Sequence, residues 1–338
     1  MRAVQLKEVG ALHLVEVPDP QPRPGEVVVR VSAAGMCGSD RHLVSGEYPG
    51  QTPVILGHEF EGIVVGGDES DQVRIGDRVT VNPNIACGVC SSCVQGLVAH
   101  CRNLSAYGVD RDGGFAEFVA VRTSQTHVLP ATLGEHLGAL CEPLSCCLRA
   151  MDRADIHPGQ RVAVIGGGVM GQLLVQLARL AGATEVILST RQRERRELAE
   201  SLGATASFDP TEQDPRDAVS SPGGSAPAGV DVVFEAAGAP GSFEQAIAIV
   251  RPAGTVVIVG AAPQQMSATI RPFEIFEREL RIVGSHLNPF THARAAALVS
   301  SGVLQLEPLI TRVVGLEDLA AALQAPPGAG EVKVMMTP

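Results

Sequence analysis

The sequence is poor in lysine and in positive charge, and both shortages narrow the choice of partners. Lys7 and Lys333 are the only lysines among 26 basic residues, and 37 acidic residues leave a formal net charge of −11 at pH 7. We attribute the lysine shortage to genome composition and not to function. The negative charge argues against a nucleic-acid partner and against an anionic membrane surface.

Long apolar runs are absent, and so is a leader-like start. No stretch of about 18 apolar residues occurs, so no transmembrane helix is expected. The first twenty residues are polar and reach proline early, unlike a secretory signal. We therefore expect a cytoplasmic protein, in which thiols stay reduced. Its 338 residues suffice for about two domains.

Half of the eight cysteines fall within residues 87–101, spaced C-x2-C-x2-C-x7-C. The four are Cys87, Cys90, Cys93 and Cys101. In a reduced compartment such a cluster indicates a metal site, and four thiolates suit tetrahedral zinc. An iron–sulfur cluster is the main alternative, although the fourth cysteine comes late and lacks the following proline. A site with four protein ligands has no position for substrate, so we expect a structural role.

Two styles of sequence divide the chain. Residues 1–150 contain alternating apolar runs such as EVVVRVSAAG and EGIVVGG, broken by proline and glycine, which predict a strand-rich body. From about residue 152, apolar runs alternate with helical patterns: RVAVIG, VMGQLLVQLARLAGA, EVILST, RQRERRELAESLG, VDVVFEAAG, TVVIVG and LRIVGSH. This alternation predicts an α/β fold with a doubly wound parallel sheet. We read 211–229 as a loop and 330–338 as a strand that returns to the first body.

A phosphate-binding turn follows the first of these strands. VIGGGVMG contains Gly166, Gly168 and Gly171 as G-x-G-x-x-G, directly between a predicted strand and a predicted helix. The three glycines suit a tight turn, a close approach to pyrophosphate and close helix–strand packing. With Val169 and Met170 at the helix start, the turn predicts a dinucleotide site; a glycine-rich turn without nucleotide is the alternative.

A second set of metal donors lies outside the cysteine cluster. AAGMCGSDRH supplies Cys37, GHEFEG supplies His58 and Glu59, and LCEPLSCC supplies Glu142. Each alone is more often a core or hydrogen-bonded residue. Together, thiolate, imidazole and carboxylate form a ligand set that leaves a position open on zinc, as catalytic sites do.

These stretches resemble the zinc-dependent medium-chain dehydrogenases over essentially the whole chain. GHEFEG matches the family's G-H-E-x-x-G, the four-cysteine stretch matches its structural zinc lobe, and GGGVMG matches its cofactor turn. CGSDRH, GHE and CEPLS look most like the polyol (sorbitol-type) branch. The resemblance implies a GroES-like catalytic domain of 1–151 and 287–338, a Rossmann domain of 152–286 inserted in it, and an active site between them.

The resemblance also implies roles for individual residues in binding the catalytic zinc. Cys37 and His58 match its ligands, Glu59 matches a residue that is a direct ligand in some members, and Glu142 matches a carboxylate that binds zinc or its water. Some polyol members lack the four-cysteine loop, so its presence leaves the branch open. With both sites filled, each chain holds two zinc ions.

The implied reaction is hydride transfer between a secondary alcohol and a nicotinamide. Zinc acts as Lewis acid, Ser39 takes the alcohol proton, and His42 relays it outward. We expect a polyol, sugar alcohol or vicinal diol as substrate, and a homo-oligomer, dimer or tetramer. The alternatives are a simple secondary-alcohol dehydrogenase or ketone reductase, an amino-alcohol (threonine-type) dehydrogenase, a zinc-free reductase, and a non-enzymatic protein that kept the fold.

The end of the second Rossmann strand bears on cofactor choice. NAD-preferring enzymes of this fold carry an acidic residue about 20 residues beyond the glycine turn, and here that position is Thr190. Hydroxyls of Ser189 and Thr190 and the guanidinium of Arg191 suit a ribose phosphate. The sequence thus favours NADP over NAD. The following helix carries two arginines that we assign to a solvated face, Arg195 and Arg196, balanced by Glu194 and Glu197.

Overall fold

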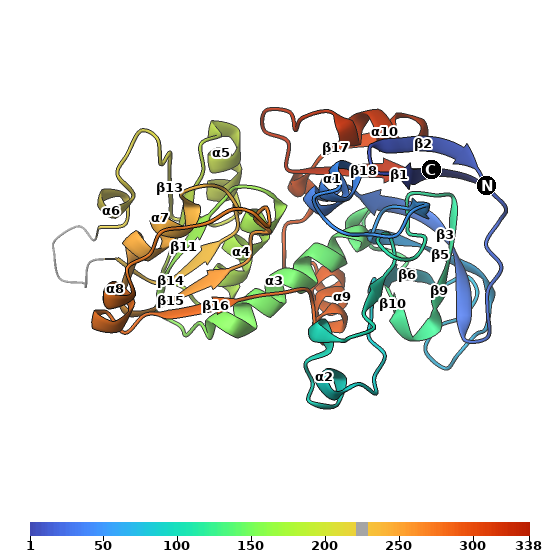
Figure 1. Ribbon diagram of the computed structural model, residues 1–338, viewed down its shortest axis with the longest axis horizontal. Helices are drawn as coiled ribbons and strands as arrows, with labels where there is room; N and C mark the ends of the chain where they lie inside the picture. The colour runs from blue at the N-terminus through green and yellow to red at the C-terminus, as the bar shows by residue number, and fades with distance from the viewer. Residues whose placement is uncertain (221–228) are drawn as a thin grey trace. The chain divides into compact units, whose positions relative to one another are not determined.

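The computed structural model describes residues 1–220 and 229–338 and divides the chain into two compact units. Unit 1 comprises Met1–Ser145, Asn288–Gly328 and Lys333–Pro338, and unit 2 comprises Cys146–Leu287 and Ala329–Val332. We expected boundaries at 151/152 and 286/287 and a continuous C-terminal segment. The first boundary differs because helix α3 (Cys141–Ala154) spans it, and residues 329–332 join unit 2 because they contact helix α5 (Arg193–Ser201) there. Figure 1 labels all the α-helices and most of the strands of both units.

Unit 1 is built around a seven-stranded sheet of order β10-β6-β5-β3-β18-β17, in which β9 also pairs with β3. Its strands are β3 (Glu26–Gly35), β5 (Glu59–Gly67), β6 (Arg78–Val81), β9 (Phe118–Arg122), β10 (Thr126–Val128), β17 (Ile310–Gly315) and β18 (Lys333–Thr337). Strand β3 lies inside this sheet, between β5 and β18. Its alternate residues Val27, Val29 and Val31 are buried, because successive side chains of a strand point to opposite faces of the sheet.

Smaller elements complete unit 1. A second sheet has the order β2-β1-β4, and β7 pairs with β8. These strands are β1 (Arg2–Glu8), β2 (Ala11–Glu16), β4 (Val54–Ile55), β7 (Asn84–Ile85) and β8 (Ser105–Ala106). The helices are α1 (Gly38–Ser45), α2 (Ser91–Val94), α9 (His292–Ser301) and α10 (Leu316–Gln324), with 3-10 turns at Val98–His100, Thr123–Gln125, Leu137–Leu140 and Glu307–Leu309.

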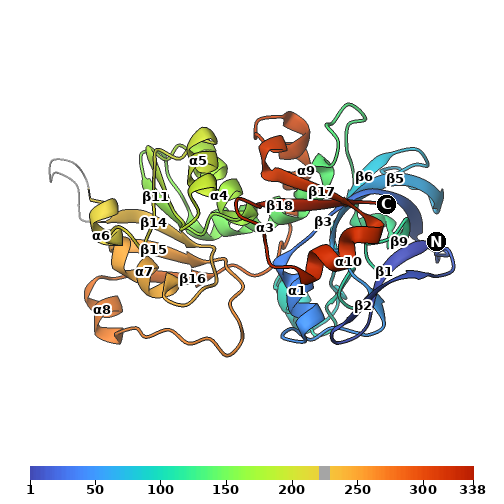
Figure 2. The same cartoon turned by 90° about the horizontal axis from the view of Figure 1, so that it is seen from above.

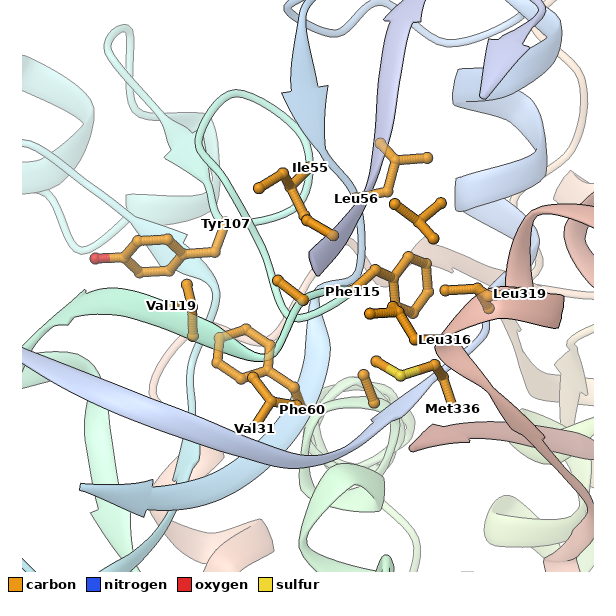
Figure 3. Close-up of a cluster of buried hydrophobic side chains, with 14 of the residues drawn as sticks. Val31, Ile55, Leu56, Phe60, Tyr107, Phe115, Val119, Leu316, Leu319 and Met336 are labelled. Atoms are coloured by element: carbon orange, nitrogen blue, oxygen red, sulfur yellow. The ribbon is translucent and has the colours of Figure 1, made fainter. Parts of the chain in front are cut away.

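The core of unit 1 joins residues from both ends of the chain. Figure 3 shows Phe60 and Phe115 among aliphatic side chains that include Leu316 and Leu319 of α10. The C-terminal strand also returns to this unit, as predicted: β18 pairs antiparallel with β3, with Met335 opposite Gly35. This pairing places the start of β18 beside the start of α1, where Met36 N donates to Val334 O.

Unit 2 is a six-stranded parallel sheet of order β13-β12-β11-β14-β15-β16. The strands are β11 (Arg161–Ile165), β12 (Glu185–Ser189), β13 (Ala206–Phe208), β14 (Val230–Glu235), β15 (Val250–Ile258) and β16 (Arg281–Gly284). Figure 2 shows α4 (Val169–Leu180) and α5 on one face and α7 (Ser242–Ile249) and α8 (Pro272–Glu277) on the other. The predicted doubly wound sheet is confirmed, since helices on both faces allow continuous apolar strands.

One connection of unit 2 and the lengths of the helices were also predicted from the sequence. The expected loop at 211–229 contains a short helix, α6 (Pro215–Ala218), capped by the Asp214 side chain, while 221–228 lie outside the described residues. Within the described ranges, no helix combines the length and the apolarity needed to cross a membrane.

Candidate active site

Helix α1 begins at the first metal-donor candidate. Cys37 is its N-cap residue, and Asp40, three residues later, accepts a hydrogen bond from the Cys37 backbone N at 2.8 Å through Oδ2. This reciprocal arrangement is a capping box, which fixes the start of the helix. Asp40 is fully buried, so its second oxygen needs a partner inside the protein.

Strand pairing brings His58 and Glu59 to Cys37. Glu59 opens β5 opposite Gly35 of β3, two residues before Cys37. One donor atom from each of Cys37, His58 and Glu59 lies within 4.8 Å of the other two. We call this group the Cys37 site. It brings together three of the four donors expected for an open zinc site.

The neighbours of His58 orient its ring. Its Nδ1 lies 3.3 Å from Asp40 Oδ1, and its Nε2 lies 3.4 Å from Ser39 Oγ. Burial lowers the pKa of His58, but the charges and hydrogen bonds of Asp40 and Cys37 outweigh it and raise that pKa well above the usual value. A carboxylate behind a histidine is the arrangement that aims the other ring nitrogen at a metal. The residues present therefore fit a zinc ion.

A buried ion pair lies beside this group. Lys333, the first residue of β18, donates from Nζ to Glu59 Oε2 at 2.6 Å and to Met36 O at 2.9 Å. Both side chains of the pair are 1% exposed. Although burial lowers the pKa of Lys333, the negative charges of Glu59 and Cys37 raise it, so the amine stays protonated. Gly35 makes room for the carboxylate, since a Cβ there would collide with Glu59 Oε2.

The remaining predicted residues of unit 1 lie around this group. Glu142 is buried in the first turn of α3, but it is not among the three clustered donors. His42 lies one turn after Ser39 on α1, where its Nδ1 pairs with Glu47 and its ring stacks on Tyr48 at 4.7 Å. The structure thus places Ser39 at the donor group and gives His42 an exposed acidic neighbour.

The four-cysteine loop is a separate cluster. The donor atoms of Cys87, Cys90, Cys93 and Cys101 all lie within 4.8 Å of one another. Hydrogen bonds from the backbone amides of Cys93 and Arg102 lower the pKa of Cys90 to about 6. Burial and the neighbouring Cys90 thiol raise that of Cys93 to about 12. Four sulfur donors with a backbone that already stabilises a thiolate fit a closed zinc site.

The glycine turn of unit 2 has the geometry that its motif predicts. Gly166 has a φ of +108°, and a Cβ at Gly171 would collide with Gly166 O. At Gly168, the N-cap residue of α4, a Cβ would meet nothing within 4 Å. Val169 and Met170 form the first turn of α4, whose N-terminus has no side-chain cap. Open space and free amide groups at a helix start suit a phosphate.

The end of β12 carries the three residues that we predicted to contact a ribose phosphate. Ser189 is 2% exposed, and its Oγ accepts a hydrogen bond from Gln245 Nε2 at 2.7 Å. Its hydroxyl is therefore turned toward the protein interior. Thr190 side-chain atoms lie against Gly167 of the turn, and Arg191 is exposed. Thr190 and Arg191 remain the candidates for a ribose contact.

The expected solvated face of α5 is wrong for Arg195 and Arg196. Arg196 donates to Thr190 O at 2.8 Å and pairs with Asp209 at 3.3 Å. Arg195 donates to Glu331 O, and burial lowers its pKa. The partner of Arg195 lies 136 residues away, whereas Thr190 and Asp209 lie 6 and 13 residues from Arg196, and none of them is a glutamate side chain of α5. Arg193, which does pair with Glu197 at 2.7 Å, lies on the exposed face.

Two residues of the site were missed by reasoning from the sequence. Asp40 had a detectable signal, since it stands three residues after Cys37, at capping-box spacing. For Lys333 the only signal in the sequence was its rarity, since it is one of two lysines in an arginine-rich chain. Its partner Glu59 is 274 residues away, and no local pattern links them.

Comparisons with known proteins place the chain in a family. Residues 23–131 match the alcohol dehydrogenase GroES-like domain, and residues 169–300 match the zinc-binding dehydrogenase domain. D-altritol 5-dehydrogenase of Agrobacterium fabrum is 33% identical, with 94% of each chain covered. L-threonine 3-dehydrogenase of Pyrococcus furiosus is 36% identical, with 90% of this chain and 88% of that one covered.

A solved structure resembles the whole chain. The zinc-binding dehydrogenase of Sinorhizobium meliloti 1021, bound to NADP, is 49% identical and has a TM-score of 0.97, with 100% of this chain and 99% of that chain covered. Together with the two domain matches, these relatives show that the chain is a member of the zinc-dependent medium-chain dehydrogenase family, whose polyol branch it resembles.

Proposed function

We propose that the chain oxidises a polyol, sugar alcohol or vicinal diol at a secondary carbon, or reduces the corresponding ketone, with a nicotinamide cofactor. The observation that carries the proposal is the donor group of Cys37, His58 and Glu59 with the Ser39 hydroxyl beside His58. The D-altritol dehydrogenase relative supports the substrate class.

The residues in and around the Cys37 site have separate roles in alcohol oxidation: they bind metal, orient a ligand or transfer a proton. Cys37, His58 and Glu59 would hold zinc, which when bound supplies a Lewis acid for the alcohol. Asp40 orients His58, and Ser39 accepts the alcohol proton through its hydroxyl. His42, next to Glu47 near the surface, passes that proton to water. A bound nicotinamide would supply the hydride acceptor, so the electron pair would leave the substrate separately from the proton that Ser39 accepts.

A substrate panel tests this proposal. Polyols, vicinal diols, simple secondary alcohols and L-threonine are compared by kcat/KM from the absorbance of reduced cofactor. We expect the diols and polyols to be the most efficient. Higher efficiency with simple alcohols would overturn the substrate class.

An amino-alcohol substrate is the second candidate. It is favoured by the L-threonine 3-dehydrogenase relative, which is 36% identical. L-threonine in the same panel decides between the two, because both oxidise a secondary alcohol but only this one requires the amino group. A higher kcat/KM with L-threonine than with analogues that lack the amino group would establish an amino-alcohol substrate.

We propose two zinc ions per chain, one at the Cys37 site and one in the four-cysteine loop. The second is supported by four thiols within 4.8 Å of one another. Metal analysis of the purified protein, with Cys37→Ser and Cys93→Ser each losing one equivalent, tests this assignment. Visible absorption of an iron–sulfur cluster would contradict it.

We also propose that NADP is preferred over NAD. Support comes from Thr190 at the position where NAD-binding members carry an acid, from the exposed Arg191 beside it, and from the NADP-bound relative. We expect at least about tenfold higher kcat/KM with NADP, the worth of one charge-assisted hydrogen bond. Arg191→Ala should remove most of this preference and leave NAD use nearly unchanged, with Arg193→Ala on the exposed face as control. Equal use of both cofactors by the wild type would contradict the assignment.

Assembly into a dimer or tetramer remains a proposal, as does a cytoplasmic location. The edge strand β16 is the candidate contact, because it pairs only with β15 in the described part of the sheet. Light scattering after size-exclusion chromatography measures the oligomeric state, and a monomer at micromolar concentration would contradict it.

A further inference from the structure

The Lys333–Glu59 pair is more than a buried salt bridge, because one of its members is a metal-donor candidate. Lys333 Nζ binds Glu59 Oε2 at 2.6 Å, and its second contact, to Met36 O at 2.9 Å, fixes the ammonium group to the backbone next to Cys37. A carboxylate oxygen that accepts a charge-assisted hydrogen bond is a weaker metal ligand than a free one, since both cations draw on the same oxygen.

Geometry keeps Glu59 within reach of the ammonium group. Glu59 Oε2 lies over Gly35, where a side chain would displace it, and Gly35 pairs with Glu59 across β3 and β5. On the other side, β18 starts at Lys333 and pairs with β3 at Met335. The two partners are therefore held by the two strands that flank β3 in one sheet, β5 and β18.

The charges around the site show what the ammonium group changes. A Cys37 thiolate, Asp40 and Glu59 contribute three negative charges, and all three residues lie within the Cys37 site or beside it. A divalent metal and Lys333 together neutralise them. If Lys333 were replaced by a neutral residue, the metal would be the only cation beside these three anions. Because a buried anion needs a cation, Glu59 would then bind the metal with both oxygens.

We propose that Lys333 is a positioning residue that withholds Glu59 Oε2 from the metal and so keeps one metal position open for substrate. The proposal rests on the proposed function, because it requires a metal at the Cys37 site. It assigns a role to a residue at the far end of the chain, which neither binds the metal nor touches the substrate.

The test compares Lys333→Met with Lys7→Met, which removes the other lysine from the exposed end of β1. Each protein is prepared with zinc and with cobalt at the Cys37 site. In Lys333→Met we expect Glu59 to bind the metal fully. Zinc should then resist a competing chelator about tenfold more strongly, the worth of one charge-assisted hydrogen bond. The visible cobalt bands should weaken, as they do at higher coordination number, and kcat should fall about tenfold. Lys7→Met should match the wild type in all three measurements.

Glu59→Gln provides the second arm. If Lys333 acts through Glu59, then Lys333→Met combined with Glu59→Gln should match Glu59→Gln alone in chelator resistance and cobalt spectrum. Thermal unfolding of every variant checks that it is folded. If Lys333→Met alone does not fold, the double variant, which removes both charges of the pair, is still compared with Glu59→Gln, and a difference in either metal measurement overturns the proposal.

The outcomes separate this inference from the proposed function. A wild type in which Cys37→Ser removes no metal would overturn both. A wild type that binds metal at the Cys37 site, with chelator resistance and cobalt spectrum unchanged in Lys333→Met, would overturn the role of Lys333 alone. A fall in kcat with an unchanged cobalt spectrum would show that Lys333 only supports the fold. The role of Lys333 would also be overturned if the double variant, Lys333→Met with Glu59→Gln, differed from Glu59→Gln alone in chelator resistance or in cobalt spectrum.

Discussion

The Cys37 site and the four-cysteine loop are two donor clusters of one unit that are built in opposite ways. The loop takes four sulfurs from fifteen consecutive residues, and its exposed Val89 and Val94, 82% and 75% accessible, show how little core surrounds it. The Cys37 site takes different donors from two segments, and its supporting residues Asp40 and Lys333 are fully buried. The difference suits a closed structural site and an open reactive one.

The two clusters depend on different parts of the fold. The loop needs only its own sequence to bring its thiols together, so the metal stabilises the fold locally. The Cys37 site exists only when β3, β5 and β18 are paired, because these strands carry Gly35, Glu59 and Lys333 to one place. Its donors are thus positioned by the strand pairing of the sheet, and a rigid support of this kind is what a reactive site requires.

The largest effect expected is on turnover, from Cys37→Ser. Loss of a ligand from the open site should lower kcat by more than about a thousandfold, since metal Lewis acidity contributes several kcal/mol to such reactions. The urea midpoint should change little, because the capping Asp40 remains. Steady-state kinetics and urea unfolding measure the two effects. Activity within tenfold of the wild type would remove Cys37 from the proposed mechanism.

Cys93→Ser should show the reverse pattern. Removing one thiolate from the closed site should lower the free energy of unfolding by more than about 3 kcal/mol. At a temperature where the variant stays folded, kcat should remain within about threefold of the wild type, because the loop does not touch substrate. Loss of turnover without loss of stability would erase the contrast between the two clusters.

Acid should destabilise the unit that carries both donor clusters through one buried histidine. His292 is buried against Thr80 of β6 and against His127, and burial lowers its pKa to about 3. The unfolded chain therefore binds more protons than the folded one between about pH 6.5 and 3. The free energy of unfolding must fall as pH falls through this window, by up to about 1.4 kcal/mol per unit.

The corresponding measurement is urea unfolding at pH 7 and pH 5. The wild type should lose about 2 kcal/mol from this group over that interval, and His292→Gln should lose correspondingly less. The exposed His13→Gln on β2 should behave as the wild type does. If His292→Gln shows the full acid sensitivity, another group is responsible.

The smallest effect expected is from a single methyl group at Gly35. Gly35→Ala places a Cβ against Glu59 Oε2 and should push the carboxylate off Lys333, with a change of about tenfold in chelator resistance of zinc at the Cys37 site. Gly66→Ala, on β5 with nothing within 4 Å of its added Cβ, is the matched control. The four-cysteine loop should retain its zinc in both variants, and equal behaviour of the two at the Cys37 site would contradict the close packing of Glu59 on Gly35.

Features that depend on short spacing could be predicted from the sequence. The four cysteines converge because few residues separate them, and the glycine turn forms because Gly166 and Gly171 permit a tight strand-to-helix connection. The parallel sheet of unit 2 followed from the regular alternation of apolar strands with helices, and the return of the C-terminal strand followed from the strand-rich character of residues 1–150. Local geometry and hydrophobic period suffice for such features.

Only the tertiary structure decided which polar groups meet across long stretches of chain. It paired Lys333 with Glu59, turned the Ser189 hydroxyl toward Gln245, and drew Arg195 and Arg196 away from solvent. It also left Glu142 outside the clustered donors. A buried charge must find a partner wherever the fold provides one, so its partner depends on strand order and register and not on neighbours in sequence.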